Sequence, residues 1–373
     1  MLQTGKSQED ALFEVEDTIE CLRHFAGYSD KLAGQAHTGN GLHAYTQKEP
    51  YGTVGLITSF NYPLLLTGWK LAPSLAAGNC AIVKPAPQTP LTTLALAGLA
   101  TDILPAGVLS VLPGGAEIGQ AILKGVDKIS FTGSTAVGQS IMREAAATLT
   151  PITLECGGKN AAIVLADADL DEAARHIASG AFSNAGQNCC AVSRVLVSVE
   201  VHDTFLDKLS QHLDTQDWGP LIDQTQYERV LGHIERATES PAFVGPRNND
   251  GQSGYYVPPT VFTQVDDHSP LARQEIFGPV LSILKPFRTI EEAIGRANNS
   301  PYGLAAGVFT KDYKRAHSIV PQLKAGVVWV NTYNLMPSFL PFGGVKMSGI
   351  GKDLGQAAMN EFTIEKSVMF GLT

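Results

Sequence analysis

Two stretches of the chain alternate short apolar runs with longer helical patterns. The first extends from residue 51 to residue 154, and the second begins at residue 161. Short apolar strands separated by helices are typical of βαβ units, in which helices cover both faces of a parallel sheet. The pattern therefore predicts an α/β fold. The expected strands lie at residues 54–58, 80–83, 108–112, 128–131, 152–154, 161–165, 194–199, 280–284, 307–310 and 327–331.

The helical patterns and the remaining segments complete this outline. Gly157 and Gly158 separate the two stretches, and residues 245–259 are expected to form a loop because they are rich in Gly, Pro, Asn and Ser. Residues 41–50 and 363–370 are predicted strands outside the alternation, either for edge pairing between subunits or for an ordinary surface hairpin. Helices are expected at residues 14–32, 66–77, 91–104, 117–124 and 135–149.

Composition narrows the class of protein. A chain of 373 residues with 44% hydrophobic and 17% charged residues is globular and long enough for two domains. Its formal charge of −9 does not favour binding to the negatively charged backbone of nucleic acid. Five cysteines without a Cys-x-x-Cys pair are not a disulfide framework, which predicts a reducing, cytoplasmic setting. No apolar run approaches the ~20 residues that span a bilayer, so no membrane role is expected.

Several known motifs are missing or incomplete. The nine histidines form no His-x-x-x-His or Cys/His cluster, so no metal site is predicted. Residues 133–140 look like a phosphate loop, but Gln139 replaces the required Lys, which excludes a P-loop NTPase. The run Phe131-Thr132-Gly133-Ser134 still ends a strand and opens a helix. That helix start could hold a cofactor phosphate, or it could be a tight turn with an ordinary cap.

Three segments carry reactive side chains in unusual settings. Cys189 follows a helical stretch in a turn rich in Gly, Asn and Gln, which suits a reactive thiol better than core packing, with Cys190 as its rival. Glu155 ends an apolar strand before two glycines, so it is either a partly desolvated general base or a surface carboxylate. Asn61 follows an early strand, where its amide could stabilise an oxyanion or form an Asx-turn before the helix that begins at Pro63.

These residues stand in motifs that resemble the aldehyde dehydrogenase superfamily from about residue 18 onward. The run Leu154-Glu-Cys-Gly-Gly-Lys159 resembles the family's glutamate signature, and Gly186-Gln187-Asn188-Cys189 resembles its cysteine signature. The resemblance implies a Rossmann-type cofactor domain, an α/β catalytic domain and a small oligomerisation β-element. The other matching motifs, in the expected order, are Lys84-Pro85, Phe131-Thr132-Gly133-Ser134, Glu275-Ile-Phe277-Gly278-Pro279 and Pro341-Phe342-Gly343-Gly344.

The resemblance also implies a reaction, the NAD(P)-dependent oxidation of an aldehyde to a carboxylic acid. It makes Cys189 the nucleophile that forms a thiohemiacetal, whose oxygen is held by the Asn61 amide and the Cys189 backbone N–H. Glu155 then activates the water that hydrolyses the thioester, which argues against a coenzyme-A-acylating relative. Lys70 and Asp353 match positions proposed in the family to relay the released proton.

By the same resemblance, Glu275 hydrogen-bonds the nicotinamide ribose, Lys84 reaches the adenosine ribose and Ser134 the pyrophosphate. NAD-preferring relatives often carry Glu at the position of Pro87, where a carboxylate would repel the 2′-phosphate of NADP. Because Pro cannot do so, either NAD or NADP is expected as the cofactor. The full set of implied cofactor-binding residues is Ser59, Phe60, Lys84, Pro87, Gly133, Ser134, Glu275 and Phe277.

Four residues match positions that line the family's substrate tunnel: Tyr62, Trp69, Met336 and Phe342. Their apolar and aromatic character suits a hydrophobic or aromatic aldehyde, although aromatic walls also hold cations.

The resemblance implies a division of the chain into domains, and it also shows where the chain differs from the family. Residues 1–31 and 51–157 correspond to the cofactor domain, 158–360 to the catalytic domain, and 32–50 with 361–373 to strands of a homodimer or homotetramer. Relatives begin well upstream of Met1, and the connection 211–219 is short. Loss of packed elements is expected to weaken cofactor binding. Two hypotheses follow: an NAD(P)-dependent aldehyde dehydrogenase, and a catalytically silent relative with a structural or binding role.

Overall fold

The computed structural model describes residues 1–213, 219–246 and 254–372. The chain forms two compact units, which are described separately below. The first unit comprises Met1–Ala11, Cys156–Met336 and Gly343–Gly349, and the second comprises Leu12–Glu155, Pro337–Phe342 and Ile350–Thr373. The functions expected of the domain ranges stay predictions.

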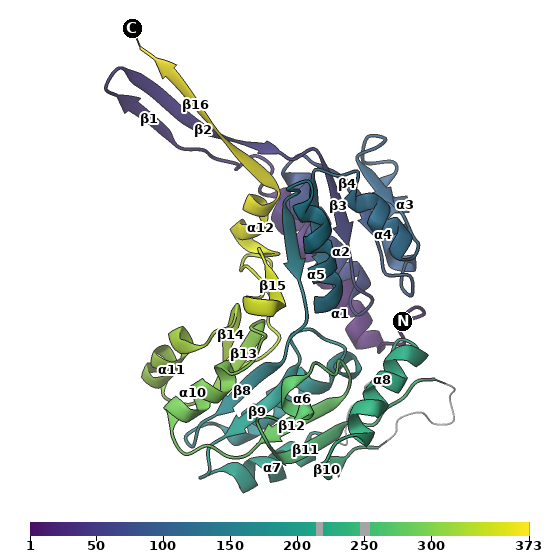
Figure 1. Ribbon diagram of the computed structural model, residues 1–373, viewed down its shortest axis with the longest axis vertical. Helices are drawn as coiled ribbons and strands as arrows, with labels where there is room; N and C mark the ends of the chain where they lie inside the picture. The colour runs from purple at the N-terminus through teal and green to yellow at the C-terminus, as the bar shows by residue number, and fades with distance from the viewer. Residues whose placement is uncertain (214–218, 247–253, 373) are drawn as a thin grey trace. The chain divides into compact units, whose positions relative to one another are not determined.

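The second unit is built on a six-stranded sheet in the order β15-β7-β6-β3-β4-β5, with β7 to β5 parallel (Figure 1). All five strands expected between residues 54 and 154 are confirmed. Central β6 is buried along its whole length, including its polar residues Lys128, Ser130 and Thr132. The strands are β3 (Thr53–Ile57), β4 (Cys80–Lys84), β5 (Leu109–Val111), β6 (Lys128–Thr132), β7 (Ile152–Glu155) and β15 (Gly349–Ile350). The helices are α1 (Gln8–Ala26), α2 (Pro63–Ala76), α3 (Leu91–Ala100), α4 (Ala116–Leu123), α5 (Thr135–Ala146) and α12 (Gly355–Glu361).

The strand order of this sheet creates a switch point. The chain passes from β3 outward through β4 to β5, then returns to the other side of β3 as β6. Crossovers therefore leave β3 and β6 in opposite directions, and ligands of open α/β sheets bind at the carboxyl ends of such a strand pair.

The first unit contains a seven-stranded sheet in the order β10-β11-β12-β9-β8-β13-β14. Only the β10–β11 pair is antiparallel, and the five strands expected from sequence are confirmed. The strands are β8 (Asn160–Val164), β9 (Val192–Val197), β10 (Pro241–Val244), β11 (Thr260–Val265), β12 (Val280–Leu284), β13 (Ala305–Phe309) and β14 (Val327–Val330). The helices are α6 (Leu170–Phe182), α7 (His202–Gln211), α8 (Gln224–Glu235), α9 (Pro270–Arg273), α10 (Ile290–Asn298) and α11 (Tyr313–Ile319).

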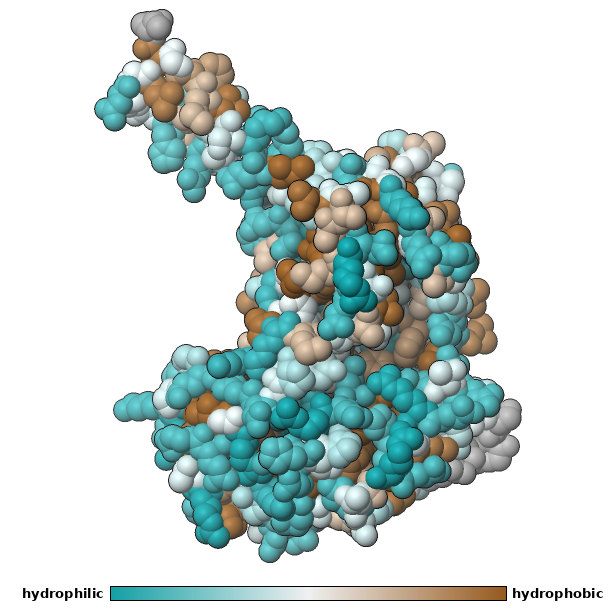
Figure 2. Space-filling model, in the orientation of Figure 1, coloured by the Kyte–Doolittle hydropathy of each residue, from teal (hydrophilic) through white to brown (hydrophobic). Residues whose placement is uncertain are grey.

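An antiparallel arm of three strands projects from the rest of the second unit (Figure 1). It consists of β1 (Ala36–Gly39), β2 (Leu42–Pro50) and β16 (Thr363–Gly371), so both predicted strands outside the alternation are confirmed. Figure 2 shows apolar side chains toward its end, where Met369 is 67% and Phe370 is 49% exposed. The expected role of this arm in oligomerisation stays a prediction.

A few elements differ from the sequence prediction. Helix α1 begins at Gln8 and not at residue 14, because the Ser7 hydroxyl accepts a hydrogen bond from the Asp10 N–H and caps an earlier start. Strands β10 and β11 were not predicted. Only the four-residue helix α9 lies between β11 and β12, and among the described residues no helix lies between β10 and β11, so the alternation with long helices that identified the other strands is absent. The described parts of the expected loop, 245–246 and 254–259, contain no helix or strand; residues 247–253, and 214–218 of the short connection, lie outside the described residues.

Candidate functional site

Three sequence motifs converge at one edge of the first unit's sheet. Residues 157–159 precede β8, Cys189 precedes β9 and Glu275 precedes β12. The strands β8, β9 and β12 are adjacent and parallel, so the segments before them meet at the amino edge. The Asn160 amide nitrogen donates to the Cys189 carbonyl at 2.9 Å, and the Gly158 N–H donates to a Glu275 carboxylate oxygen at 2.9 Å. The structure thus brings Cys189 and Glu275 together around one short segment.

A strained turn presents Cys189. Asn184, Ala185 and Gly186 all have φ between +54° and +69°, a region that non-glycine residues rarely occupy. Glycine is required at position 186, since an added Cβ atom would lie 2.3 Å from the Gly278 carbonyl oxygen. Gln187 fixes the turn, because its side chain accepts from the Ile222 N–H at 2.9 Å and donates to the Asn184 carbonyl at 3.2 Å.

The two neighbouring cysteines differ in environment. Cys190 is 1% exposed, and its sulfur lies 3.2 Å from the Asn188 amide oxygen and 3.4 Å from that of Asn334. Cys189 remains partly exposed. The pKa of the Cys189 thiol is raised well above its usual range by the hydrogen bond with Cys190, by burial and by negative charge on Cys190 and Glu275. Cys189 is therefore the accessible thiol of the pair, and its reaction requires a base to take the proton.

Glu275 lies against backbone. A Cβ atom at Gly157 would come within 2.2 Å of the Glu275 carboxylate, so glycine is required for this close approach. Burial raises the pKa of Glu275, while the Gly158 N–H and the charges of Arg229 and Lys159 oppose the rise. Phe277 adopts φ +61°, and its carbonyl accepts from Gln226 at 2.7 Å, which secures the turn that carries both residues.

In the second unit, Asn61 lies in the turn between β3 and α2 and is buried. Helix α2 begins with Pro63 at its first turn, as the sequence predicted, but its N-cap residue Tyr62 makes no side-chain cap. Instead Glu14 of α1 accepts from the Leu64 N–H at 2.7 Å, so a carboxylate from another helix satisfies this N-terminus.

Glu155 is the last residue of β7 and is only 3% exposed, which rules out the surface carboxylate. Its carbonyl accepts from the Gly133 N–H at 3.0 Å, so β7 and the turn after β6 are joined at this point. The nearby charge of Glu155 partly opposes the lowering of the Lys352 pKa by burial. The side chain therefore lies in a desolvated position, as a general base requires.

Lys70 on α2 forms a buried ion pair with Asp353. The ammonium nitrogen lies 2.7 Å from the Asp353 carboxylate and 3.1 Å from the Ser130 hydroxyl. The structure thus joins the two residues that the resemblance linked.

The switch point of the second unit fits a dinucleotide. The hydroxyl oxygens of Thr58 and Thr132, which follow or end β3 and β6, are buried and make no hydrogen bond within the described part of the chain. Ser134 caps α5 by accepting from the Val137 N–H, so a helix N-terminus opens at the same edge. Lys84 ends the neighbouring β4, and burial lowers its pKa against the opposing charge of Glu117. Unsatisfied hydroxyls, a helix N-terminus and a lysine are suitable partners for ribose and phosphate groups.

The remaining cofactor positions lie at the same edge. Ser59 and Phe60 follow β3 and are half-buried, and Pro87 follows β4 and is exposed. Gly133 leaves no room for a side chain, since an added Cβ atom would lie 2.4 Å from the Phe131 ring.

The expected substrate positions are divided between the units. In the second unit, the rings of Trp69 and Phe342 lie 5.1 Å apart between centroids, and both are buried. The Trp69 indole donates to Asp17 at 3.1 Å, and Tyr62 is half-buried at the start of α2. Met336 belongs to the first unit and is half-buried.

Sequence reasoning did not single out several supporting residues. Asn160 donates to the carbonyls of both Cys189 and Ala191, and the Tyr333 hydroxyl donates to the Cys190 carbonyl at 3.0 Å. Asn160 directly follows the glutamate motif at the first position of a buried strand, and a polar residue there was an available signal. Nothing in the sequence pattern distinguishes Tyr333.

Within the described residues, no group of three or more His, Cys, Asp and Glu side chains could hold a metal ion. Among the same residues, no helix has the length and apolar character needed to cross a membrane.

Comparison with known proteins gives one consistent family. The profile of the aldehyde dehydrogenase family matches residues 1–368. The mitochondrial aldehyde dehydrogenase of Homo sapiens is 42% identical over 374 residues, covering 96% of this chain and 72% of that protein. The cytosolic aldehyde dehydrogenase 1 of Mus musculus is 44% identical over 375 residues, covering 96% and 74%. The NAD⁺ complex of the aldehyde dehydrogenase from Bacillus cereus superposes with a TM-score of 0.96 at 42% identity, covering 100% of this chain and 79% of that one.

Proposed function

This chain belongs to the aldehyde dehydrogenase family, and we propose that it oxidises its aldehyde through a covalent intermediate on Cys189. As a member of the family, it is an NAD- or NADP-dependent enzyme that oxidises aldehydes. The observation that carries the proposal is the contrast within the cysteine pair. Cys190 is 1% exposed, whereas Cys189 is partly exposed at the end of a strained turn.

In the proposed reaction, the Cys189 thiol loses its proton and its sulfur bonds to the aldehyde carbon, which gives a thiohemiacetal. The carbonyl oxygen gains negative charge, and the Asn61 amide and the Cys189 N–H donate to it. Removing one such donor typically slows catalysis by about 10²–10³-fold. A bound nicotinamide would accept the hydride that leaves the thiohemiacetal carbon, and this loss of hydride turns the thiohemiacetal into a thioester. Glu155 takes a proton from the water that hydrolyses the resulting thioester, so the products are a carboxylic acid and a free thiol.

The cofactor is proposed to lie along residues already described. Thr58, Thr132 and the N-terminus of α5 offer donors to its polar groups, and Lys84 offers a charge. Glu275 accepts from the nicotinamide ribose, with Phe277 beside it. The exposed Pro87 carries no carboxylate to repel a 2′-phosphate, so the proposal includes NAD and NADP alike.

The substrate is proposed to be a hydrophobic or aromatic aldehyde. The tilted ring contact of Trp69 with Phe342 supports an apolar lining for the substrate, and Tyr62 and Met336 are the other two proposed lining residues. Homo-oligomerisation through the arm of β1, β2 and β16 is part of the same proposal, supported by its exposed Met369 and Phe370.

Covalent labelling tests the proposal most directly. An electrophilic aldehyde analogue should modify Cys189 in the wild-type protein, as located by peptide mass spectrometry. Cys189→Ala should abolish labelling and aldehyde oxidation, whereas Cys190→Ala should retain both. The reverse pattern would overturn the assignment.

A melting experiment separates the enzyme from a silent relative. A ligand that binds only the folded state stabilises it by about 2.7 kcal/mol at a hundredfold excess over its Kd. NAD or NADP should therefore raise the melting temperature of the purified chain. No shift with either dinucleotide, even when both are present in large excess, would favour a structural or binding role.

A further inference from the structure

Lys159 is a buried amine with no assigned task. It is 2% exposed, and its amine nitrogen has no hydrogen-bond partner among the described residues. Its backbone is fixed firmly, because the Arg194 guanidinium donates to the Lys159 carbonyl at 2.8 Å and also to the carbonyls of Arg296 and Ala297. An unpaired ammonium in such a place is costly unless an anion faces it.

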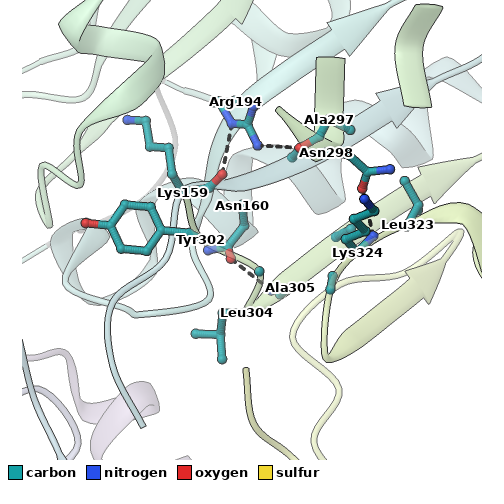
Figure 3. A pocket seen from close by; sticks show the side chains of 14 residues that line it. Lys159, Asn160, Arg194, Ala297, Asn298, Tyr302, Leu304, Ala305, Leu323 and Lys324 are labelled. Carbon is teal, nitrogen blue, oxygen red and sulfur yellow. Dashed lines mark hydrogen bonds between the residues drawn. The ribbon is translucent and has the colours of Figure 1, made fainter. Parts of the chain in front are cut away.

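Lys159 borders two small cavities of the first unit. One is shown in Figure 3, where the Lys159 amine points away from Asn298 and Lys324 on the opposite wall. The other has a volume of about 20 Å³ and is also lined by Asn188 and Glu275. That space is enough for one ordered water molecule. Among the described residues that line this second cavity, only Lys159 and Glu275 are charged.

The charges around Lys159 and Glu275 come from two neighbouring elements, β9 and α8. Arg194 on β9 opposes protonation of Lys159, and Glu275 favours it. The charge of Lys159 contributes to the lowered pKa of His233 on α8, and Arg229 on the same helix favours the ionised form of Glu275. Among the described residues, Glu275 is thus the anion whose charge favours protonation of the Lys159 amine, and burial lowers the pKa of Lys159 to about 7.

We propose that Lys159 is a positioning residue for Glu275: across the shared cavity, its ammonium group keeps the Glu275 carboxylate ionised and in place to accept from the cofactor. The inference rests on the proposed cofactor role of Glu275. One carboxylate oxygen already accepts from the Gly158 N–H, which anchors the near side of the group. The Lys159 ammonium acts from the cavity, through a water that bridges amine and carboxylate.

The test is the pH dependence of NAD⁺ binding to the full chain without aldehyde, followed by intrinsic fluorescence or calorimetry. In the wild-type protein, affinity should fall on the acid side as Glu275 gains a proton. Lys159→Met removes the stabilising charge, so this acid limb should move upward by about one pH unit, which is about fivefold weaker binding at the original midpoint and about tenfold weaker binding well below it. Lys159→Arg should restore the limb toward its original position.

Glu275→Gln separates the possible failures. It should remove the acid limb, and adding Lys159→Met to it should cause no further change. If Glu275→Gln removes the limb but Lys159→Met leaves it in place, Lys159 has no positioning role while Glu275 keeps its assignment. If Glu275→Gln leaves both the limb and the affinity unchanged, the cofactor role of Glu275 is itself wrong, and the inference fails with it.

Two further variants control for a general charge effect and for misfolding. Lys311→Met removes a lysine of the same unit whose side chain is 68% exposed, and it should reproduce the wild-type profile. Lys159→Gln repeats the test with a neutral polar side chain and replaces Lys159→Met if that variant fails to fold. A shifted limb in Lys311→Met would show that general charge, and not Lys159, sets the profile.

Discussion

The Lys70 ammonium nitrogen lies 2.7 Å from the Asp353 carboxylate, in a pair whose side chains are 0% and 1% exposed. The pair joins α2 to the segment that follows β15, and the Ser130 hydroxyl oxygen of β6 accepts from the same nitrogen at 3.1 Å. A buried ion pair contributes little by itself, but removing one partner leaves an uncompensated charge.

Breaking this pair should therefore destabilise the protein strongly. Lys70→Met or Asp353→Asn is expected to lower the free energy of unfolding by about 3–5 kcal/mol, measured by urea denaturation. The double variant Lys70→Met/Asp353→Asn should lose less than the sum of the single changes, because neither charge remains. Additive losses would mean that the two groups are not coupled.

Glu155 should act after hydride transfer. Glu155→Gln keeps the shape of the buried side chain but cannot take a proton from water, so the first burst of NAD(P)H should persist. Steady-state turnover should then fall by about 10²–10⁴-fold, the usual contribution of a general base. Stopped-flow absorbance at the reduced nicotinamide band separates the two phases. Loss of the burst itself would assign Glu155 to deprotonation of the Cys189 thiol, whose pKa is raised.

Gly157 provides a steric test of Glu275. In Gly157→Ala, the new methyl group would lie 2.2 Å from the Glu275 carboxylate, which must move and lose its 2.9 Å bond with the Gly158 N–H. Loss of a hydrogen bond to a charged group typically costs about 1.5–3 kcal/mol, so NAD⁺ affinity should fall by about 10–100-fold.

The matched control is Gly295→Ala. Gly295 lies inside α10 of the same unit, and no atom lies within 4 Å of its added Cβ. Alanine should stabilise this helix by about 0.5–1 kcal/mol and leave NAD⁺ affinity unchanged. Equal affinities in both variants would remove Glu275 from the cofactor site.

The core strands could be predicted because burial imposes a simple pattern. All positions of β6, β8, β12 and β13 are buried, and the sequences of β8, β12 and β13 are mostly apolar, which leaves few alternatives to a buried strand. The pair β10 and β11 at the edge of the sheet was not predicted, because no helix separates these two strands in the part of the chain that the structure describes. Helix ends were also missed where a cap decided them, as Ser7 does for α1.

Candidate reactive side chains stand out in the sequence because their settings are unusual, as with Cys189 in its polar turn and Glu155 before two glycines. Residues that act through long-range contacts could not. Glu14 caps α2 from a position 50 residues earlier, and Asn160 binds the carbonyl of a residue 29 positions later. Only the fold creates these neighbours, so no local pattern reports them.

Lys159 should make stability depend on pH in a defined direction. Its pKa is lowered from 10.5 to about 7 in the folded protein, because burial disfavours the charged form. Between these values the unfolded chain binds more protons than the folded one, so the free energy of unfolding should increase with pH. The slope from this one group should approach 1.4 kcal/mol per pH unit at about pH 8–9 and vanish well below pH 7.

Urea denaturation at a series of pH values measures this slope. Lys159→Met cannot take up the proton. Its free energy of unfolding should therefore rise less steeply with pH than that of the wild-type protein, and the difference in slope should correspond to about one bound proton over this range. Lys311→Met, which changes a side chain that is 68% exposed, should keep the wild-type slope. Parallel curves for wild type and Lys159→Met would mean that Lys159 stays protonated in the fold up to high pH. The Lys159 ammonium would then face the Glu275 carboxylate at every pH. In that case, only the acid limb of NAD⁺ binding would report the coupling between the two groups.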